Sequence, residues 1–94
     1  MTAMEVEVKL FGAMRDLAGR AEIRCAFSSD ATVADLLDKL TTHYPELMKR
    51  LLPGIQQGYI SVLADGLTIS TAAGFETGLN DGSVVCFLPP IAGG

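Results

Sequence analysis

The stretch from Val84 to Leu88 is apolar at every position and is followed at once by Pro89 and Pro90. An apolar run without alternation is typical of a strand that is covered on both faces. Each proline fixes φ near about −65° and lacks a backbone N–H, so no regular element continues through the pair. The sequence therefore predicts a last strand over residues 83–88. One face can rest on a helix, and the other needs a cover that so short a chain has little material to supply.

The chain of 94 residues has room for one domain, residues 1–94, with a tail over 89–94. Hydrophobic residues at 49% and charged residues at 19% place it among globular proteins rather than disordered ones. Its net charge of −4 opposes phosphate backbones and anionic lipid. We therefore expect no nucleic acid and no membrane as partner, and favour a basic groove on a protein.

The two cysteines, Cys25 and Cys86, share no CxxC spacing and stand in apolar runs, which indicates small hydrophobic side chains rather than a redox or metal site. The first residues show neither the basic nor the apolar region of a secretory signal. No apolar run approaches the ~20 residues of a membrane helix. We expect a cytoplasmic protein with reduced thiols.

The first third of the chain predicts two paired strands. Apolar residues alternate with charged ones from 4 to 10, and Phe11 then falls on the polar face, where it is a candidate for a contact patch. Gly12 breaks this strand, and residues 13–18 predict a short helical turn that ends at Gly19. Alternation resumes over residues 21–27, so the two strands are expected to pair antiparallel.

The middle of the chain predicts two helices. Thr32 is a candidate N-cap, with Asp35 three residues later in a weak form of the capping box. The apolar residues that follow keep the spacing of one buried helical stripe; they are Val33, Leu36, Leu37 and Leu40. Pro45 ends this helix and can open a second one, which is expected to stop at Pro53-Gly54.

The remaining pattern predicts more strands. Residues 59–64 and 67–69 flank the turn signal Asp65-Gly66, residues 70–77 carry no clear pattern, and residues 80–82 form another turn signal. The order of strand, strand, helix and then strands indicates an α+β fold, with a mixed sheet and one main helix packed on one face. That is a β-grasp (ubiquitin-like) layout, although periodicity alone does not separate it from other small α+β folds.

Side chains of the chain itself give little support for catalysis. The single histidine, His43, has no neighbouring nucleophile and reads as a surface or cap residue. The carboxylate pairs Asp35 with Asp38 and Glu5 with Glu7 lie on faces expected to be solvated. No phosphate-binding loop or metal-ligand spacing occurs. We therefore expect no enzyme activity from the chain alone, and no metal or cofactor bound by it.

The end of the chain offers chemistry of another kind. After the two prolines come Ile91, Ala92, Gly93 and Gly94. Glycine lacks a Cβ, so such a leader can pass through a slot too narrow for side chains. A carboxylate at Gly94 becomes an electrophile when adenylate from ATP converts it to an acyl-phosphate anhydride. The sequence thus predicts a flexible tail, with Gly94 as the reacting group; the alternative is an ordinary frayed terminus.

Four segments together carry a family resemblance. They are FGAMRDLAG at 11–19, HYPEL at 43–47, LNDGSVV at 79–85 and FLPPIAGG at 87–94. The chain resembles the MoaD/ThiS family of β-grasp sulfur carriers over nearly its whole length. The Pro-Pro form of the tail is more similar to the small, sulfur-carrier subunit of molybdopterin synthase than to the thiazole-forming branch.

The resemblance implies a cycle of loading and delivery. A ubiquitin-activating-type adenylyltransferase would use ATP to adenylate Gly94, and a sulfur donor protein would convert the adenylate to a thiocarboxylate. The tail, residues 89–94, would then enter the large catalytic subunit of molybdopterin synthase and deliver sulfur to a pterin precursor. Phe11 and Leu88 would lie in the apolar surface that contacts either partner, so the carrier would shuttle between them.

Other readings stay open. The carrier could serve thiamin, cysteine or tungsten-pterin synthesis, or the protein could be a modifier joined to lysines through isopeptide bonds. A third alternative is an interaction domain with an inert tail. Two departures from the family pattern bear on the branch: Asp65-Gly66 stands where asparagine is common, and residues 70–78 look longer. Arg15 matches an arginine of the family, and we expect it to anchor its loop.

Overall fold

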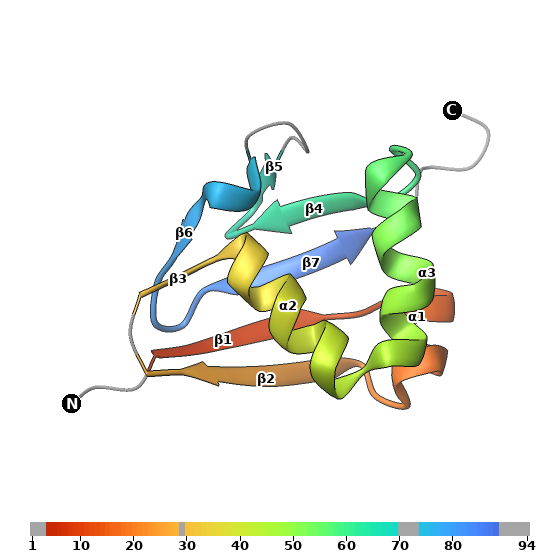
Figure 1. Ribbon diagram of the computed structural model, residues 1–94, viewed down its shortest axis with the longest axis horizontal. Helices are drawn as coiled ribbons and strands as arrows, with labels where there is room; N and C mark the ends of the chain where they lie inside the picture. Colours follow the sequence, from red (N-terminus) through yellow and green to blue (C-terminus); the bar gives the residue numbers. More distant parts are fainter. Residues whose placement is uncertain (1–3, 29, 70–73, 89–94) are drawn as a thin grey trace.

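The strand predicted at the end of the chain forms the middle of a five-stranded mixed sheet. The computed structural model describes residues 4–28, 30–69 and 74–88, and the strand order is β2-β1-β7-β4-β5 (Figure 1). The strands are β1 (Met4–Lys9), β2 (Glu22–Phe27), β4 (Ser61–Ala64), β5 (Leu67–Ile69) and β7 (Val84–Leu88). β7 runs parallel to β1 and antiparallel to β4. The predicted α+β, β-grasp architecture is confirmed.

The predicted antiparallel pair is β1 and β2, with Val8 opposite Ile23. Between them lies α1 (Gly12–Ala18), which ends where Gly19 takes the left-handed conformation, φ 78°, and donates its N–H to the Arg15 carbonyl at 2.9 Å. Glycine adopts this conformation without the Cβ clash that other residues meet. The short helical turn with a glycine stop is therefore confirmed. Ala21, predicted to lie in the strand, precedes β2 and is exposed.

Helix α2 (Val33–His43) crosses one face of the sheet (Figure 1). Its capping box is complete, since Thr32 Oγ1 accepts from the Asp35 N–H at 3.3 Å and Asp35 Oδ2 accepts from the Thr32 N–H at 2.9 Å. These two bonds satisfy donors that have no partner within the helix. The buried stripe is the one predicted from the spacing: Val33, Leu36, Leu37 and Leu40.

Helix α3 (Pro45–Gln56) packs beside α2 and continues past its predicted end. The prediction of a stop at Pro53-Gly54 is wrong, because Pro53 lies inside the helix. Pro53 has no N–H, so the helix loses one backbone hydrogen bond there. Ile55, one turn beyond Leu51, is nevertheless fully buried and extends the apolar stripe. Burial of an isoleucine contributes about 1.5–3 kcal/mol, which offsets the missing bond.

A second, two-stranded sheet was not predicted from the sequence. It pairs β3 (Ala31–Thr32) with β6 (Gly78–Leu79), close to the 3-10 turn η1 (Gly74–Glu76). Each strand has two residues, which is too short for alternation to show. This small sheet fixes the approach to α2, because the Val33 N–H also donates to the Thr77 carbonyl at 3.0 Å.

The turn between β4 and β5 is tied to the start of β7. Asp65 has φ 51°, and its carboxylate accepts from the Val84 N–H and from the Ser83 hydroxyl, both at 2.9 Å. Its own N–H donates to the Val84 carbonyl at 2.8 Å. A carboxylate accepts both bonds through separate oxygens, which gives a physical reason for aspartate at this turn. The strand predicted from residue 59 begins only at Ser61.

None of the helices in the described part of the chain is both long and apolar enough to span a membrane.

Candidate functional site

Strand β7 presents two unlike faces. Val85 and Phe87 are fully buried beneath the helices, whereas Val84, Cys86 and Leu88 on the opposite side are only half-buried. The prediction that this strand is covered on both faces is therefore met on the helix side alone. We call the side of the sheet away from α2 and α3 the open face. Apolar side chains of β7 remain partly accessible there.

The strand register gathers an apolar patch on the open face. Cys86 lies between Lys9 and Leu63, and Leu88 lies opposite Ser61. We define the Phe11–Leu88 patch as Phe11, Leu63, Cys86 and Leu88. Continuing the parallel register of β1 and β7 by two residues places Phe11 beside Leu88, and the extended backbone of Phe11, φ −133° and ψ 152°, permits this.

Phe11 is 44% exposed, as expected for a residue on the polar face of its strand. An exposed aromatic beside half-buried aliphatic groups is the kind of surface that marks a protein contact. The extended register therefore puts Phe11 and Leu88, the two residues predicted for the partner interface, on the same side of the sheet. Sequence reasoning missed Leu63 and treated Cys86 as an ordinary buried residue. The alternation 84, 86, 88 within the apolar run was the available signal.

The other half of the open face is charged. Glu7 lies between Arg24 and Val84, and Lys9 lies between Glu22 and Cys86. A hydrogen bond and like-charge repulsion from Glu7 raise the pKa of Glu22 above its ordinary value of 4.5. This cluster is solvated, so its carboxylates lack the apolar enclosure that general acid–base pairs use. This agrees with the prediction that the glutamates of β1 lie on a solvated face rather than form an acid–base pair.

The last described residue of the chain is also the last residue of the central strand. β7 ends at Leu88, so the following residues begin at the Phe11–Leu88 patch. The predicted tail residues lie outside the described part of the chain and stay predictions: Pro89, Pro90, Ile91, Ala92, Gly93 and Gly94. The described structure thus supplies the base of the predicted working end and the surface beside it.

The remaining candidates separate from this site. Asp35 is engaged in the α2 capping box, and Asp38 is exposed on the same helix. His43 lies at the end of α2, beside a cavity that faces β2. Arg15 accepts the Gly19 N–H through its backbone, and the structure shows no ion pair for its side chain among the described residues. In the same described ranges, no three His, Cys, Asp or Glu side chains cluster as a metal site.

Comparison with protein families gives one match, in which the model of the ThiS family covers residues 8–94. Small archaeal modifier protein 3 of Haloferax volcanii is 36% identical over 92 residues, spanning 97% of this chain and 100% of that protein.

Solved structures share the fold. The crystal structure of SAMP1 from Haloferax volcanii superposes with a TM-score of 0.77 at 32% identity, over 96% of this chain and 99% of that one. A molybdopterin converting factor subunit 1 from Pyrococcus furiosus, described as putative, gives a TM-score of 0.76 at 26% identity, over 94% and 99% of the two chains. The complex of subunits 1 and 2 of the Helicobacter pylori factor contains the same fold, at 24% identity, over 97% of this chain and 100% of that one, with a TM-score of 0.60.

Proposed function

The chain belongs to the ThiS family of small ubiquitin-like sulfur carriers and modifiers, and from this premise we propose that it is a sulfur carrier loaded at the carboxylate of Gly94. The family model matches through residue 94, so the Gly-Gly pair falls within the matched region. The chain contributes the acyl group and the docking surface, while separate enzymes contribute the catalysis.

The chemistry proceeds in two steps. A carboxylate oxygen of Gly94 attacks the α-phosphorus of ATP, pyrophosphate leaves, and an acyl-adenylate forms. Hydrosulfide supplied by a donor protein then attacks the acyl carbon; the C–S bond forms as the bond between the acyl carbon and the AMP oxygen breaks, AMP leaves, and the product is the thiocarboxylate. An adenylyltransferase of the ubiquitin-activating type catalyses the first step and supplies the ATP site. Gly93 and Gly94 allow the tail to enter that site because they carry no side chains.

The observation that carries this proposal is the position of the Phe11–Leu88 patch at the base of the tail. A partner that grips Phe11 and Leu88 holds the sheet at the point from which residues 89–94 extend. A rigid grip at the base lowers the entropy lost when the tail enters an active site. Both the loading enzyme and the sulfur-accepting enzyme need this grip, so the two dockings exclude each other.

The accepting enzyme we propose is the large subunit of molybdopterin synthase. Support comes from the fold and 26% identity shared with the Pyrococcus furiosus protein described as a molybdopterin converting factor subunit 1. In Helicobacter pylori, subunits 1 and 2 of a molybdopterin-converting factor form a protein–protein complex, and a chain of that complex shares this fold. In this role the chain is the small subunit, and it delivers sulfur to a pterin precursor.

A second candidate function has its own support. The 36% identity with a small archaeal modifier protein favours conjugation, in which a lysine amine attacks the activated Gly94 and forms an isopeptide bond. The activation step is common to both functions. They diverge at the nucleophile, which is sulfur for the carrier and nitrogen for the modifier.

Intact-mass measurement tests activation and separates the two outcomes. The protein is incubated with its adenylyltransferase, ATP and a sulfide source, with and without a lysate of its own cells. The carrier gains the mass of exchanging one oxygen for sulfur, whereas the modifier yields a ladder of larger conjugates. Deleting Gly94 should abolish both products and leave the melting temperature unchanged.

The Phe11→Asp variant tests docking through the Phe11–Leu88 patch in the same assay. Loss of the thiocarboxylate or conjugate product with an unchanged melting temperature supports docking there. Leu67→Asp is the matched control, because Leu67 is 74% exposed on the edge strand β5. Full activity of a chain lacking Gly94 would contradict the proposal and favour an interaction domain with an inert tail. Sulfur delivery to a thiazole, cysteine or tungsten-pterin pathway, in place of the molybdopterin precursor, would overturn only the choice of accepting enzyme.

A further inference from the structure

The edge strand β2 carries backbone groups without a strand partner. In the described part of the chain β2 pairs only with β1, at the end of the sheet opposite β5. The Leu10 N–H donates to the Ala21 carbonyl at 2.8 Å, which fixes which residues of β2 face β1. Because backbone direction alternates along a strand, Glu22, Arg24 and Ala26 turn their N–H and C=O groups outward.

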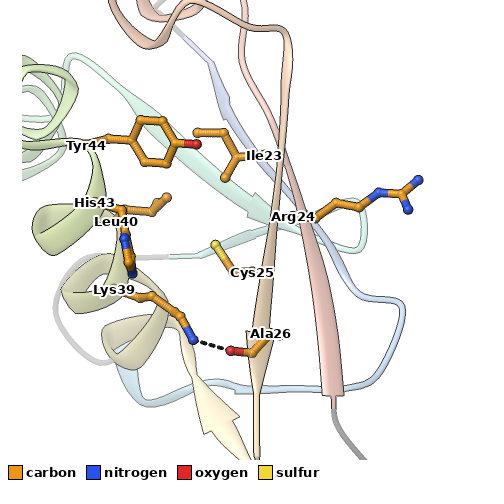
Figure 2. A pocket seen from close by; sticks show the side chains of 8 residues that line it. All are labelled: Ile23, Arg24, Cys25, Ala26, Lys39, Leu40, His43 and Tyr44. Carbon is orange, nitrogen blue, oxygen red and sulfur yellow. Dashed lines mark hydrogen bonds between the residues drawn. The ribbon is translucent and has the colours of Figure 1, made fainter.

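A cavity of about 420 Å³ adjoins this edge, between β2 and α2 (Figure 2). Residues of β2, residues of α2 and Tyr44, which joins α2 to α3, line it: Ile23, Arg24, Cys25, Ala26, Lys39, Leu40, His43 and Tyr44. Burial raises the pKa of the Cys25 thiol, although Lys39 opposes this, so Cys25 stays protonated as an apolar part of the floor. The volume is sufficient for side chains of a bound segment.

Lys39 links helix α2 to the edge strand β2. Its ammonium donates a hydrogen bond to the outward carbonyl of Ala26 (Figure 2). The same ammonium lies 4.6 Å from the centre of the Phe27 ring. The bond to Ala26 demonstrates that a donor can reach the β2 edge from the cavity side. The Arg24 side chain points away from the cavity and pairs with Glu5 at 3.7 Å.

The charge of the cavity is opposite to that of the whole molecule. Lys39 supplies the positive charge of its lining and no carboxylate lines it, among the described residues, although the chain has 11 acidic and 7 basic residues. An uncovered strand edge is a template for another strand, and the side chains next to it set which strand fits. The edge supplies main-chain bonds, the cavity takes an apolar side chain, and Lys39 takes a carboxylate.

We propose that the groove between β2 and α2 binds an extended, acidic segment of a partner protein, which adds to the sheet alongside β2. The segment places an apolar side chain in the cavity and a carboxylate on Lys39, whose bond to Ala26 exchanges for the ion pair. The groove lies on the helix side of an edge strand separated from β7 by β1. A segment bound there leaves the Phe11–Leu88 patch and the tail accessible, so this site is independent of the proposed function.

The test uses the full chain and a defined probe. The probe is a capped peptide of eight residues in which valine alternates with threonine and two aspartates follow, and its matched control carries two lysines instead. Amide exchange and NMR shifts are followed on titration. We expect slowed exchange at the N–H groups of Glu22, Arg24 and Ala26, and weaker binding of the lysine peptide.

Variants then test the assigned contacts. Lys39→Glu should weaken binding about tenfold, because an attraction becomes a repulsion, while Lys49→Glu makes the same charge change on α3 and should alter it less than about twofold. Lys39→Gln keeps the length of the side chain and should weaken binding to a lesser extent, and it serves if the glutamate variant does not fold. Arg24→Pro removes one outward N–H without touching the β1 bonds, and should reduce binding and protection along the edge.

Three results would overturn the inference. One is a binding footprint on the Phe11–Leu88 patch instead of β2. Another is equal affinity for the acidic and basic peptides. The third is unchanged binding by Lys39→Glu together with self-association of that variant, which would make Lys39 a guard against edge pairing rather than a contact for a partner.

Discussion

The two faces of the central strand β7 differ in what their side chains do for the molecule. On the helix side, Val85 and Phe87 are completely buried with the stripes of α2 and α3. On the open face, Cys86 and Leu88 are half-buried, and Phe11 beside them is 44% exposed. The same strand therefore has one face whose apolar groups hold the fold and one whose apolar groups remain available to another protein.

This difference shows how one strand can stabilise the fold on one face and leave apolar side chains partly accessible on the other. Hydrophobic burial stabilises in proportion to the apolar area removed from water. Phe87 is completely buried, so its side chain already contributes its full burial energy in the free protein. In the proposed docking, Phe11 and Leu88 contribute most of their burial energy when a partner covers them. Changes on the two faces of one strand should therefore separate stability from docking.

Phe87→Ala should cause the largest loss of stability, about 3–5 kcal/mol, because it leaves a cavity under the helices. Urea denaturation followed by circular dichroism measures this. A small domain has only about 5–15 kcal/mol of total stability, so the variant should approach unfolding at 37 °C. A loss below about 1 kcal/mol would contradict the assignment of Phe87 to the core.

Asp65→Ala should cost about 1–3 kcal/mol, because it leaves the Ser83 hydroxyl and the Val84 N–H without their acceptor. The change tests whether polar contacts at the start of β7 hold its two faces in register. Asp65→Asn is the matched comparison, since asparagine tolerates the positive φ and keeps one oxygen. An Asp65→Asn variant as stable as the parent would contradict a role for the second carboxylate oxygen.

Leu88→Asp should change stability by less than about 1 kcal/mol in the free protein, because its side chain is only half-buried. Binding to the adenylyltransferase, measured by titration calorimetry, should fall by about tenfold or more, since a charge enters an apolar contact. The combination sharpens the comparison with Phe87. A large drop in melting temperature with intact binding would reverse the roles of the two faces.

Glu22→Gln should have the smallest effect, on the charged half of the open face. The pKa of Glu22 is raised above 4.5 in the folded protein, so ionised Glu22 opposes folding at higher pH. That penalty is absent below pH 4.5 and grows as the pH rises through the raised value. The variant should therefore melt slightly higher than the parent at neutral pH, and at the same temperature near pH 3. Added salt should reduce the gain at neutral pH by screening Glu7.

The sequence predicted those parts of the fold in which one pattern repeats. Alternation located β1 and the exposed position of Phe11, and helical spacing located the buried stripe of α2. The extension of α3 past Pro53 was missed, because a local rule about proline was outweighed by the burial of Ile55. Two-residue strands such as β3 and β6 leave no pattern to read.

The candidate site was predictable in part. The family resemblance implied Phe11 and Leu88, the wrong-face aromatic and the unbroken apolar run agreed with it, and the strand register, continued by two residues, puts both on one side of the sheet. Leu63 and the cavity beneath β2 depend on which strands become neighbours, and Lys39 reaches Ala26 across 13 positions of the chain. Such contacts are products of the tertiary fold, so spacing within one segment does not reveal them.

The parallel pairing of β1 with β7 links the timing of synthesis to folding. The middle strand of the sheet is the last one made, and until residue 88 has left the ribosome β1 and β4 lack the neighbour that lies between them. An interrupted chain thus exposes Val8 and Val62, which are buried only in the finished sheet. Chaperones and proteases should recognise truncated chains through this surface. The position of β7 in the sheet therefore favours the removal of chains that end before it.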